Sequence, residues 1–277
     1  MNIEAAPVCY RHTNREAHIR CQRCERPICP DCMKSAAVGF QCPECVREGQ
    51  RSVRQGRPLT LGASGPVVTY ALIGIDLAVF ALLHVWQPLL DILSLHTSQL
   101  CDVRINGQWE TLLNVPADQC SLNGGTFAAG VSHGEWWQPL TSVFTHSAVW
   151  HIAGNMLSLW MIGPLVETVL GRVRYLISYV VCGLAGSALV LAISTPEAGT
   201  LGASGAIFGL LGVLVVLFLR RGLPLQQLGI VVVLNFFITF TVPNISWQGH
   251  VGGFVAGLVI GALITYTPLF RRRILQR

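Results

Sequence analysis

The sequence has little charge. Only 12% of its 277 residues are Asp, Glu, Lys or Arg, whereas 52% are hydrophobic. Soluble domains carry about 25% charged residues. The shortage of charge therefore argues against a soluble globular protein and favours a protein that lies in a membrane. The formal net charge of +5 is modest, so its distribution along the chain is more informative than its size.

Several other features are missing from the sequence. Residues 1–60 contain no apolar stretch of the kind that a secretory signal needs, so no cleaved signal is expected. The chain has no repeat of 20–50 residues and no low-complexity tract. The absence of an inverted repeat and of paired broken spans also disfavours a transporter.

Cysteine is scarce over most of the chain, because seven of the 10 cysteines precede residue 46. This clustering marks a separate module. We predict a small zinc-binding domain at 1–48, a basic linker containing Gly and Pro at 49–64, a membrane domain at 65–270 and a basic tail at 271–277.

From Pro66 onward the chain is mostly apolar. A helix needs roughly 20 apolar residues to cross the hydrocarbon core of a bilayer. Six runs approach this length, at approximately 66–87, 149–170, 173–194, 202–219, 225–242 and 249–269. The sequence therefore predicts an all-α polytopic membrane protein, a bundle of six transmembrane helices preceded by a small cytoplasmic zinc-binding domain.

The distribution of arginine predicts the orientation. Basic residues gather on one side of a six-span topology, at Arg47, Arg51, Arg54, Arg57, Arg172, Arg174, Arg220, Arg221, Arg271, Arg272 and Arg273. The opposite connections hold one arginine in about sixty residues (Arg104) and then none. Because cytoplasmic loops carry the excess of positive charge, both termini are expected in the cytoplasm and residues 88–148 outside the cell membrane.

Four polar residues stand where three of the runs begin on the outer side. His151 and Asn155 open the second run, Ser204 the fourth and His250 the sixth. His151 and Asn155 are four residues apart and share one helix face. Polar residues in a membrane are costly and tend to face the bundle interior or a water cavity. The four residues are therefore expected to meet at one depth.

This set of side chains is suited to nucleophilic catalysis. Ser204, between Gly202 and Gly205, becomes nucleophilic when a base such as His250 takes its proton. The Ser204 amide and the His151 and Asn155 side chains are candidate donors to an oxyanion. No carboxylate stands nearby at this depth, so we expect a dyad rather than a triad. For Ser204 alone, a cap or packing residue would be the commoner role.

Glycines recur every three or four residues in two of the runs. They are Gly253, Gly257 and Gly261 in the sixth run and Gly205, Gly209 and Gly212 in the fourth. Small residues at this spacing allow two membrane helices to pack closely. His250 lies on the face of the glycine stripe, so close packing of these runs would bring it to Ser204.

The motifs resemble those of the rhomboid family of intramembrane serine proteases. The stretch GASG, which contains Ser204, is similar to the family's GxSG motif, and His250 with its glycine stripe is similar to the sixth-span histidine. His146, His151 and Asn155 resemble the second-span motif. The segments GEWW at 134–137 and GPLVETVLG at 163–171 also match, and the resemblance covers about residues 66–270.

The resemblance implies specific roles. Ser204 would be the nucleophile, His250 the general base, and His151, Asn155 and the Ser204 amide the oxyanion hole. Glu167 would be structural, with hydrogen bonds near the cytoplasmic end. The substrate would be a transmembrane protein that enters sideways, by movement of the fifth span and of the cap over the site. Cleavage would occur in or near the transmembrane segment of that substrate.

The chain departs from the family pattern in places. Gln138 stands where the family often has Arg, and Phe208 stands where it often has Tyr stacked on the histidine. Phenylalanine can still stack but supplies no hydroxyl. Asp76, where the family often has Asn, is expected to form structural hydrogen bonds rather than to handle protons. No role is assigned to His84, His96 and His133.

The first 48 residues contain four pairs of metal-ligand residues, each with a two-residue gap. Eight ligands suffice for two tetrahedral structural zinc ions, whereas disulfides are disfavoured in a reducing cytoplasm. The spacing resembles a B-box or a similar cross-braced module. That arrangement would place one zinc on Cys9, His12, Cys29 and Cys32 and the other on Cys21, Cys24, Cys42 and Cys45. Sequential pairing stays open, and His18 is a poorer alternative ligand.

The connection at 88–148 contains Cys101 and Cys120 and no other cysteine. It is expected on the oxidising side, so we predict a disulfide between them. By the chain-entropy model a loop of this size adds about 3 kcal/mol of stability. Cys182 lies within the third run and is expected to pack there.

The sequence thus predicts an intramembrane serine protease that cleaves transmembrane proteins, contacts membrane lipid and needs no catalytic cofactor. One alternative is a catalytically silent relative that binds membrane proteins for quality control or trafficking. Another is an adaptor whose membrane part is an anchor. The zinc module is expected to bind an unidentified partner, and nucleic acid is not expected because no recognition helix is apparent.

Overall fold

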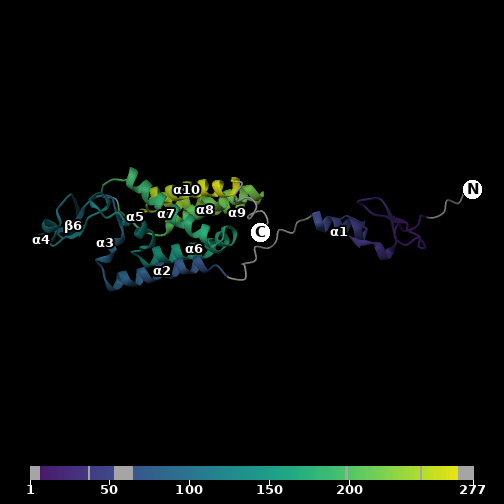
Figure 1. Cartoon of the computed structure of the whole chain (residues 1–277), viewed down its shortest axis with the longest axis horizontal. Coiled ribbons are helices and arrows are strands. Elements are labelled where there is room, and N and C mark those ends of the chain that lie inside the picture. The colour runs from purple at the N-terminus through teal and green to yellow at the C-terminus, as the bar shows by residue number, and fades with distance from the viewer. Residues whose placement is uncertain (1–6, 37, 53–64, 197–198, 244, 268–277) are drawn as a thin grey trace, which may run out of the picture. The chain divides into compact units, whose positions relative to one another are not determined.

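In the computed structural model the chain forms two compact units, residues 1–60 and 61–277, which are described separately (Figure 1). The structure describes residues 7–36, 38–52, 65–196, 199–243 and 245–267. The predicted tail at 271–277 and residues 53–64 of the predicted linker lie outside these ranges. The first linker residues, 49–52, continue a helix that ends at Ser52.

The first unit is small and has two short antiparallel hairpins. Its elements are β1 (Ile19–Arg20), β2 (Pro27–Ile28), η1 (Pro30–Cys32), β3 (Lys34–Ser35), β4 (Phe40–Gln41) and α1 (Pro43–Ser52). The buried cluster consists of Ala17, Ile28 and six cysteines. Such a core is small for a domain of this length, and a metal held by the cysteines would add to its stability.

The second unit is a helix bundle, as the apolar runs predicted (Figure 1). Its long helices are α2 (Val67–Val85), α6 (Val149–Leu170), α7 (Arg172–Ile193), α8 (Ser204–Arg221), α9 (Gln226–Thr241) and α10 (Trp247–Tyr266). Each coincides with one predicted run apart from small differences at the ends.

Five of these six helices are long and apolar enough to cross a membrane. The exception is α9, which is apolar but has 16 residues. It ends where Val242 takes an extended conformation, which is the conformation that the following Pro243 favours.

The centre of the bundle is α8, which contributes more buried residues than any other helix that the structure describes. It packs against α10 through glycines. A Cβ added at Gly253 or Gly257 would overlap the carbonyl oxygen of Gly205 or Gly209, respectively. The predicted close packing of these two runs is therefore confirmed, and it leaves no room for side chains between the two backbones.

The connection between α2 and α6, residues 86–148, contains strands that the sequence did not predict. It forms α3 (Leu89–Leu93), β5 (Leu95–His96), β6 (Leu100–Ile105), β7 (Gln108–Leu113), α4 (Ala117–Leu122), β8 (Thr126–Ala128), η2 (Val131–His133), α5 (Gln138–Thr141) and η3 (Ser142–Phe144). The strands β7, β6 and β8 make an antiparallel sheet at one end of the bundle (Figure 1).

The predicted disulfide between Cys101 and Cys120 is present and joins β6 to α4. Both cysteines are fully buried and lie beside Val103 in a small cluster of their own. The disulfide and this cluster hold the sheet together apart from the main core.

The carboxylate of Glu167, near the end of α6, fixes the start of α2. It accepts hydrogen bonds from the Val68 amide at 3.0 Å and from the Thr69 amide and hydroxyl, each at 2.8 Å. First-turn amides have no partner within their own helix, so this carboxylate satisfies two of them and ties α2 to α6. This contact is structural, as the resemblance implied.

Candidate active site

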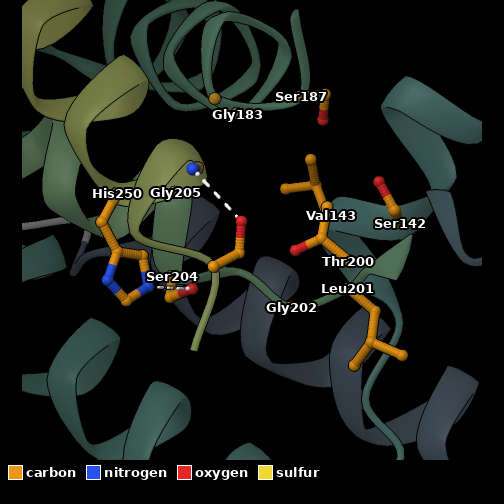
Figure 2. Close-up of a pocket in the computed structure, with 13 residues that line it drawn as sticks. Ser142, Val143, Gly183, Ser187, Thr200, Leu201, Gly202, Ser204, Gly205 and His250 are labelled. Carbon is orange, nitrogen blue, oxygen red and sulfur yellow. Dashed lines mark hydrogen bonds between the residues drawn. The ribbon is translucent and has the colours of Figure 1, made fainter. Parts of the chain in front are cut away.

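Ser204 and His250 meet where α8 and α10 begin. The Ser204 Oγ lies 2.8 Å from the His250 Nε2, which is a hydrogen-bond distance, and the pair is drawn in Figure 2. His250 is 8% exposed, and Ser204 opens α8, so its amide belongs to the first helical turn. The two residues are 46 positions apart in the sequence, and the close approach of α8 and α10 brings them together.

The other nitrogen of His250 has a partner that the sequence analysis did not identify. The Thr239 Oγ1, on α9, lies 2.7 Å from the His250 Nδ1. The same hydroxyl donates its proton to the Asn235 carbonyl oxygen at 2.8 Å. Since a hydroxyl has only one proton, the Thr239 oxygen must accept a hydrogen bond from the Nδ1–H of His250. The Nε2 is then unprotonated and can accept the Ser204 proton.

The ring of Phe208 stacks on His250. Their centroids are 4.1 Å apart and the ring planes are inclined by 13°. The prediction that phenylalanine can stack at this position is confirmed. The imidazole is thus held on one face by Phe208 and at its edge by Thr239.

His151 and Asn155 lie on α6 beside the turn that leads to Ser204. The Asn155 Nδ2 donates to the His151 carbonyl oxygen at 3.0 Å, which leaves its second N–H for another acceptor. Gly202 has a φ of +117°, and a Cβ there would lie 2.6 Å from the His151 ring. Glycine is therefore required at 202 both for its backbone conformation and for the close approach of His151.

A second buried histidine supports the same turn. The His146 Nε2 accepts a hydrogen bond from the Ala203 amide at 3.3 Å, directly before Ser204. The His146 Nδ1 lies 3.8 Å from the Asp76 Oδ1, and both residues are fully buried. Asp76 therefore lies behind the turn that precedes Ser204, but neither of its carboxylate oxygens forms a hydrogen bond with the described residues, so the structural hydrogen bonds expected of it are absent there.

A cavity of about 840 Å³ contains all four predicted site residues in its lining. Its walls include Trp150, Gly154 and Ser158 of α6 on one side and Asn235, Ile238 and Thr239 of α9 on another. A much smaller recess of about 20 Å³ lies behind Ser204, and Figure 2 shows Ser142, Ser187 and Gly183 around it. That recess has room for about one water molecule and offers it polar partners.

The first unit brings its eight predicted ligands into two groups. One group is Cys9, His12, Cys29 and Cys32, and the other is Cys21, Cys24, Cys42 and Cys45; in each, the ligand atoms lie within 4.8 Å of one another. This is the cross-braced grouping. His18 belongs to neither group, since its side chain is 73% exposed and pairs with Glu16.

The spacing within these groups fits a tetrahedral metal. The His12 Nδ1 lies 3.3 Å from the Cys29 Sγ and 3.5 Å from the Cys32 Sγ, and the sulfurs of Cys24 and Cys42 are 3.8 Å apart. Zinc with thiolate and imidazole ligands at about 2.0–2.3 Å gives ligand separations of about 3.3–3.8 Å. The Cys42 amide also donates to the Cys21 Sγ at 3.2 Å, which would stabilise a thiolate.

Several arginines of the first unit form ion pairs. Arg15 pairs with Asp31, and the Arg26 guanidinium lies 2.8 Å from the Glu44 carboxylate. Arg26 also donates to the Cys24 Sγ at 3.3 Å and lies over the Tyr10 ring. Arg15 and Arg26 therefore have partners within the unit.

Comparison with known proteins identifies the relatives of the second unit. A family model described as the Rhomboid domain matches residues 133–267. The "Rhomboid protease GluP" of Bacillus subtilis (strain 168) is 33% identical over 208 residues, which is 72% of this chain and 35% of that protein. The "RHOMBOID-like protein 5" of Arabidopsis thaliana is 33% identical over 148 residues, 50% of this chain and 48% of that protein.

A shorter relative is matched over most of its length. The "Putative rhomboid protease YdcA" of Bacillus subtilis (strain 168) is 31% identical over 139 residues, which is 48% of this chain and 70% of that protein. By contrast, the chain spans only about a third to a half of the first two relatives. The residues that the family model matches include Ser204 and His250.

Proposed function

Because the chain belongs to the rhomboid family and is a multi-pass membrane protein, we propose that it is an intramembrane serine protease. The observation that carries the proposal is the 2.8 Å contact between the Ser204 Oγ and the His250 Nε2, with the histidine tautomer set by Thr239. The substrates are transmembrane proteins, cleaved in or near their membrane segment.

In the first half of the reaction the Ser204 oxygen attacks the scissile carbonyl carbon, and its proton moves to the His250 Nε2. The tetrahedral intermediate collapses when the carbon–nitrogen bond breaks and His250 gives that proton to the leaving amine. An acyl group remains on Ser204. Water then attacks the ester carbonyl carbon and gives a proton to His250. When the bond from that carbon to the Ser204 Oγ breaks, His250 returns the proton to the Ser204 Oγ, and the acid leaves.

The negative charge that develops on the carbonyl oxygen needs donors already in place. The Ser204 amide, in the first turn of α8, is one candidate, and the free N–H of Asn155 is a second. His151 lines the same cavity and is the third. Their common position around the Gly202 turn supports this assignment.

The enzyme is oriented, we infer, with both termini in the cytoplasm and the site open to the outer side. The arginine distribution supports this orientation. The disulfide in the α2–α6 connection is also in keeping with an oxidising compartment on that side. Labelling of single introduced cysteines from each side of sealed vesicles would contradict it if residues 88–148 reacted only from the cytoplasmic side.

The two Cys/His groups of the first unit are proposed to hold two zinc ions. Thiolate and imidazole donors at these separations suit zinc, which would supply folding energy to a unit that has little apolar core. The unit is proposed to bind a partner protein rather than to take part in the chemistry.

The test is labelling with a fluorophosphonate probe, which reacts covalently with activated serines. The full chain, purified in detergent, is compared with Ser204→Ala and His250→Ala after all three are shown to be folded. We expect labelling of the parent chain only, because His250→Ala leaves the serine without its base.

A parent chain that stays unlabelled, under conditions in which another intramembrane serine protease reacts, would contradict the proposal. The function would then be that of a silent relative that binds membrane proteins. Ser204 would in that case be a packing residue at the start of α8.

A further inference from the structure

The cavity that contains Ser204 and His250 extends to the α2–α6 connection. There it is lined by Asp91 of α3, by Ser94, and by His96 of β5. None of these residues is needed for the bond-breaking chemistry described above. They line the same cavity as Ser204 and His250, so a polypeptide that fills this cavity would meet them.

Two of these residues carry polar atoms without partners. Ser94 is 3% exposed, and its buried Oγ forms no hydrogen bond within the part of the chain that the structure describes. The same holds for both ring nitrogens of His96. Buried polar atoms are almost always hydrogen-bonded, because an unpaired one has lost its hydrogen bonds to water and gained none in return. Such atoms in a cavity wall indicate that a ligand or water supplies the missing partners.

The segment that carries them is held in place by α5. The buried Gln138 side chain accepts from the His96 amide at 3.0 Å and donates to the Asp91 carbonyl oxygen at 3.3 Å. The Thr141 hydroxyl donates to the Leu93 carbonyl oxygen at 2.9 Å. On its other side β5 pairs with β9 (Gly199–Thr200), close to the catalytic turn. The three side chains are therefore presented by a fixed backbone.

The cavity has one acidic side chain at this end. Asp91 is the only Asp, Glu, Lys or Arg among the described residues that line the cavity. Burial, and then the nearby Asp102 carboxylate, raise the pKa of Asp91 above its usual value. Burial also lowers the pKa of His96, an effect that the Asp102 carboxylate opposes in part. A carboxylate in this position is stabilised by a cation, and no cationic residue is among those described in the lining.

We propose that Asp91, Ser94 and His96 form a subsite that selects a basic side chain, Lys or Arg, in the substrate segment next to the scissile bond. The proposal rests on the proposed proteolytic function and adds a substrate preference to it. An ammonium or guanidinium group donates several hydrogen bonds. The Asp91 carboxylate, the Ser94 Oγ and the unprotonated nitrogen of His96 are three acceptors for it.

The test is a comparison of matched substrates by the full chain reconstituted in lipid vesicles. A single-span model substrate carries Lys, Gln or Glu at one position at a time on either side of its cleavage site, and kcat/KM is measured for each. At one position we expect kcat/KM for the substrate with Lys to be at least about tenfold higher than for the substrate with Gln, since hydrogen bonds to charged groups contribute this much. Glu is expected to be the poorest.

Substitutions in the subsite should change this preference. In Asp91→Asn, the ratio of kcat/KM for the Lys substrate to that for the Gln substrate should be close to one. Asp91→Lys should cleave the Glu substrate best. Ser94→Ala, which removes a hydroxyl without a protein partner and so keeps the fold, should lower the ratio in part. Asp118→Asn is the matched control, because Asp118 is an exposed carboxylate of α4 outside the cavity lining, and it should keep the parent ratio.

The possible failures are distinguishable. A parent chain that cleaves the substrates without favouring Lys at any position overturns the subsite alone. An equal preference for Lys in the parent and in Asp91→Asn does the same. A parent chain that neither cleaves any substrate nor reacts with a fluorophosphonate overturns the proposed function, and the subsite with it.

Discussion

At the scale of the residue, Thr239 determines which nitrogen of His250 carries the proton. Its own proton is donated to the Asn235 carbonyl oxygen, so its oxygen accepts the Nδ1–H. This arrangement gives a neutral hydroxyl the orienting role that a carboxylate has in a Ser-His-Asp triad. Thr239 is a positioning residue, because it acts on the base and does not touch the substrate carbonyl.

We predict that Thr239→Val lowers kcat by roughly tenfold, because a buried Nδ1–H that loses its acceptor costs about 1–3 kcal/mol. Valine has the shape of threonine, so packing is preserved. KM should change little. The rate should also fall off at a different pH, since the hydrogen bond contributes to the basicity of His250. Steady-state kinetics over a range of pH is the measurement.

Thr239→Ser is the control for this prediction, because it keeps the hydroxyl and should restore most of the rate. Equal losses in the valine and serine variants would show that only packing is at stake. An unchanged pH profile in Thr239→Val would likewise remove the positioning role.

Some site residues could be predicted from the sequence and others could not. Ser204, His250, His151 and Asn155 stand in recognisable motifs at the starts of inward-running apolar segments, so topology alone predicts that they lie at one depth. Thr239 and Thr241 both carry a hydroxyl in the same apolar run, and which of them meets His250 depends on the rotation of α9. Asp91 and His96 could not be placed either, since their position depends on Gln138.

At the scale of the element, the closest packing in the described bundle is that of α8 against α10. Gly253 and Gly257 lie directly over the carbonyl oxygens of Gly205 and Gly209. In the membrane, where apolar burial does not distinguish helix from lipid, this backbone approach is a main source of attraction between helices. It also sets the distance from His250 to Ser204.

Gly257→Ala should therefore destabilise the bundle by about 2 kcal/mol or more, because overpacking at a rigid contact forces the backbones apart. It should also reduce fluorophosphonate labelling, although position 257 lies two helical turns from His250. Thermal unfolding in detergent and the labelling rate are the measurements.

The matched control is Gly74→Ala in α2, where an added Cβ meets no atom within 4 Å. It should leave both the unfolding temperature and labelling close to those of the parent. The interpretation fails if the two alanine variants behave alike.

The sequence predicted elements unequally well. The long apolar runs predicted all six helices, because length and hydropathy suffice to identify such helices. The two cysteines of the α2–α6 connection predicted the disulfide. The sheet of β6, β7 and β8 was missed, since its strands are short and alternate weakly between polar and apolar residues. The limited length of α9 was also not predicted.

At the scale of the whole molecule, two units with different sources of stability share one chain. The membrane unit is stabilised by packing around α8, whereas the first unit has a core composed largely of cysteine. The first unit is thus expected to fold only with metal. Its stability should respond to chelators, and that of the membrane unit should not.

We predict that the purified chain contains two zinc ions, one for each ligand group. Cys9→Ser and Cys21→Ser should each lower the content by one ion, whereas Cys182→Ser, which changes a buried thiol of α7 outside both groups, should not. Elemental analysis measures this content.

Complete chelation should unfold the first unit, seen as lost amide dispersion in NMR spectra, while labelling of Ser204 continues at its original rate. Labelling that disappears with the metal, in a membrane unit that is still folded, would contradict the independence of the two units.

The position of Thr239 on α9 also links the active state of the site to the position of this helix. Among the described residues of α9, only Leu228 and Thr239 are buried, so this helix is the most loosely held wall of the cavity. If a transmembrane substrate enters between α6 and α9, as the proposed function implies, it would displace α9, the helix that carries Thr239. The helix that opens the cavity is then also the helix that orients His250. While α9 is displaced, His250 would lack its hydrogen bond to Thr239 and the site would be inactive, and activity would return only after α9 closes on the substrate.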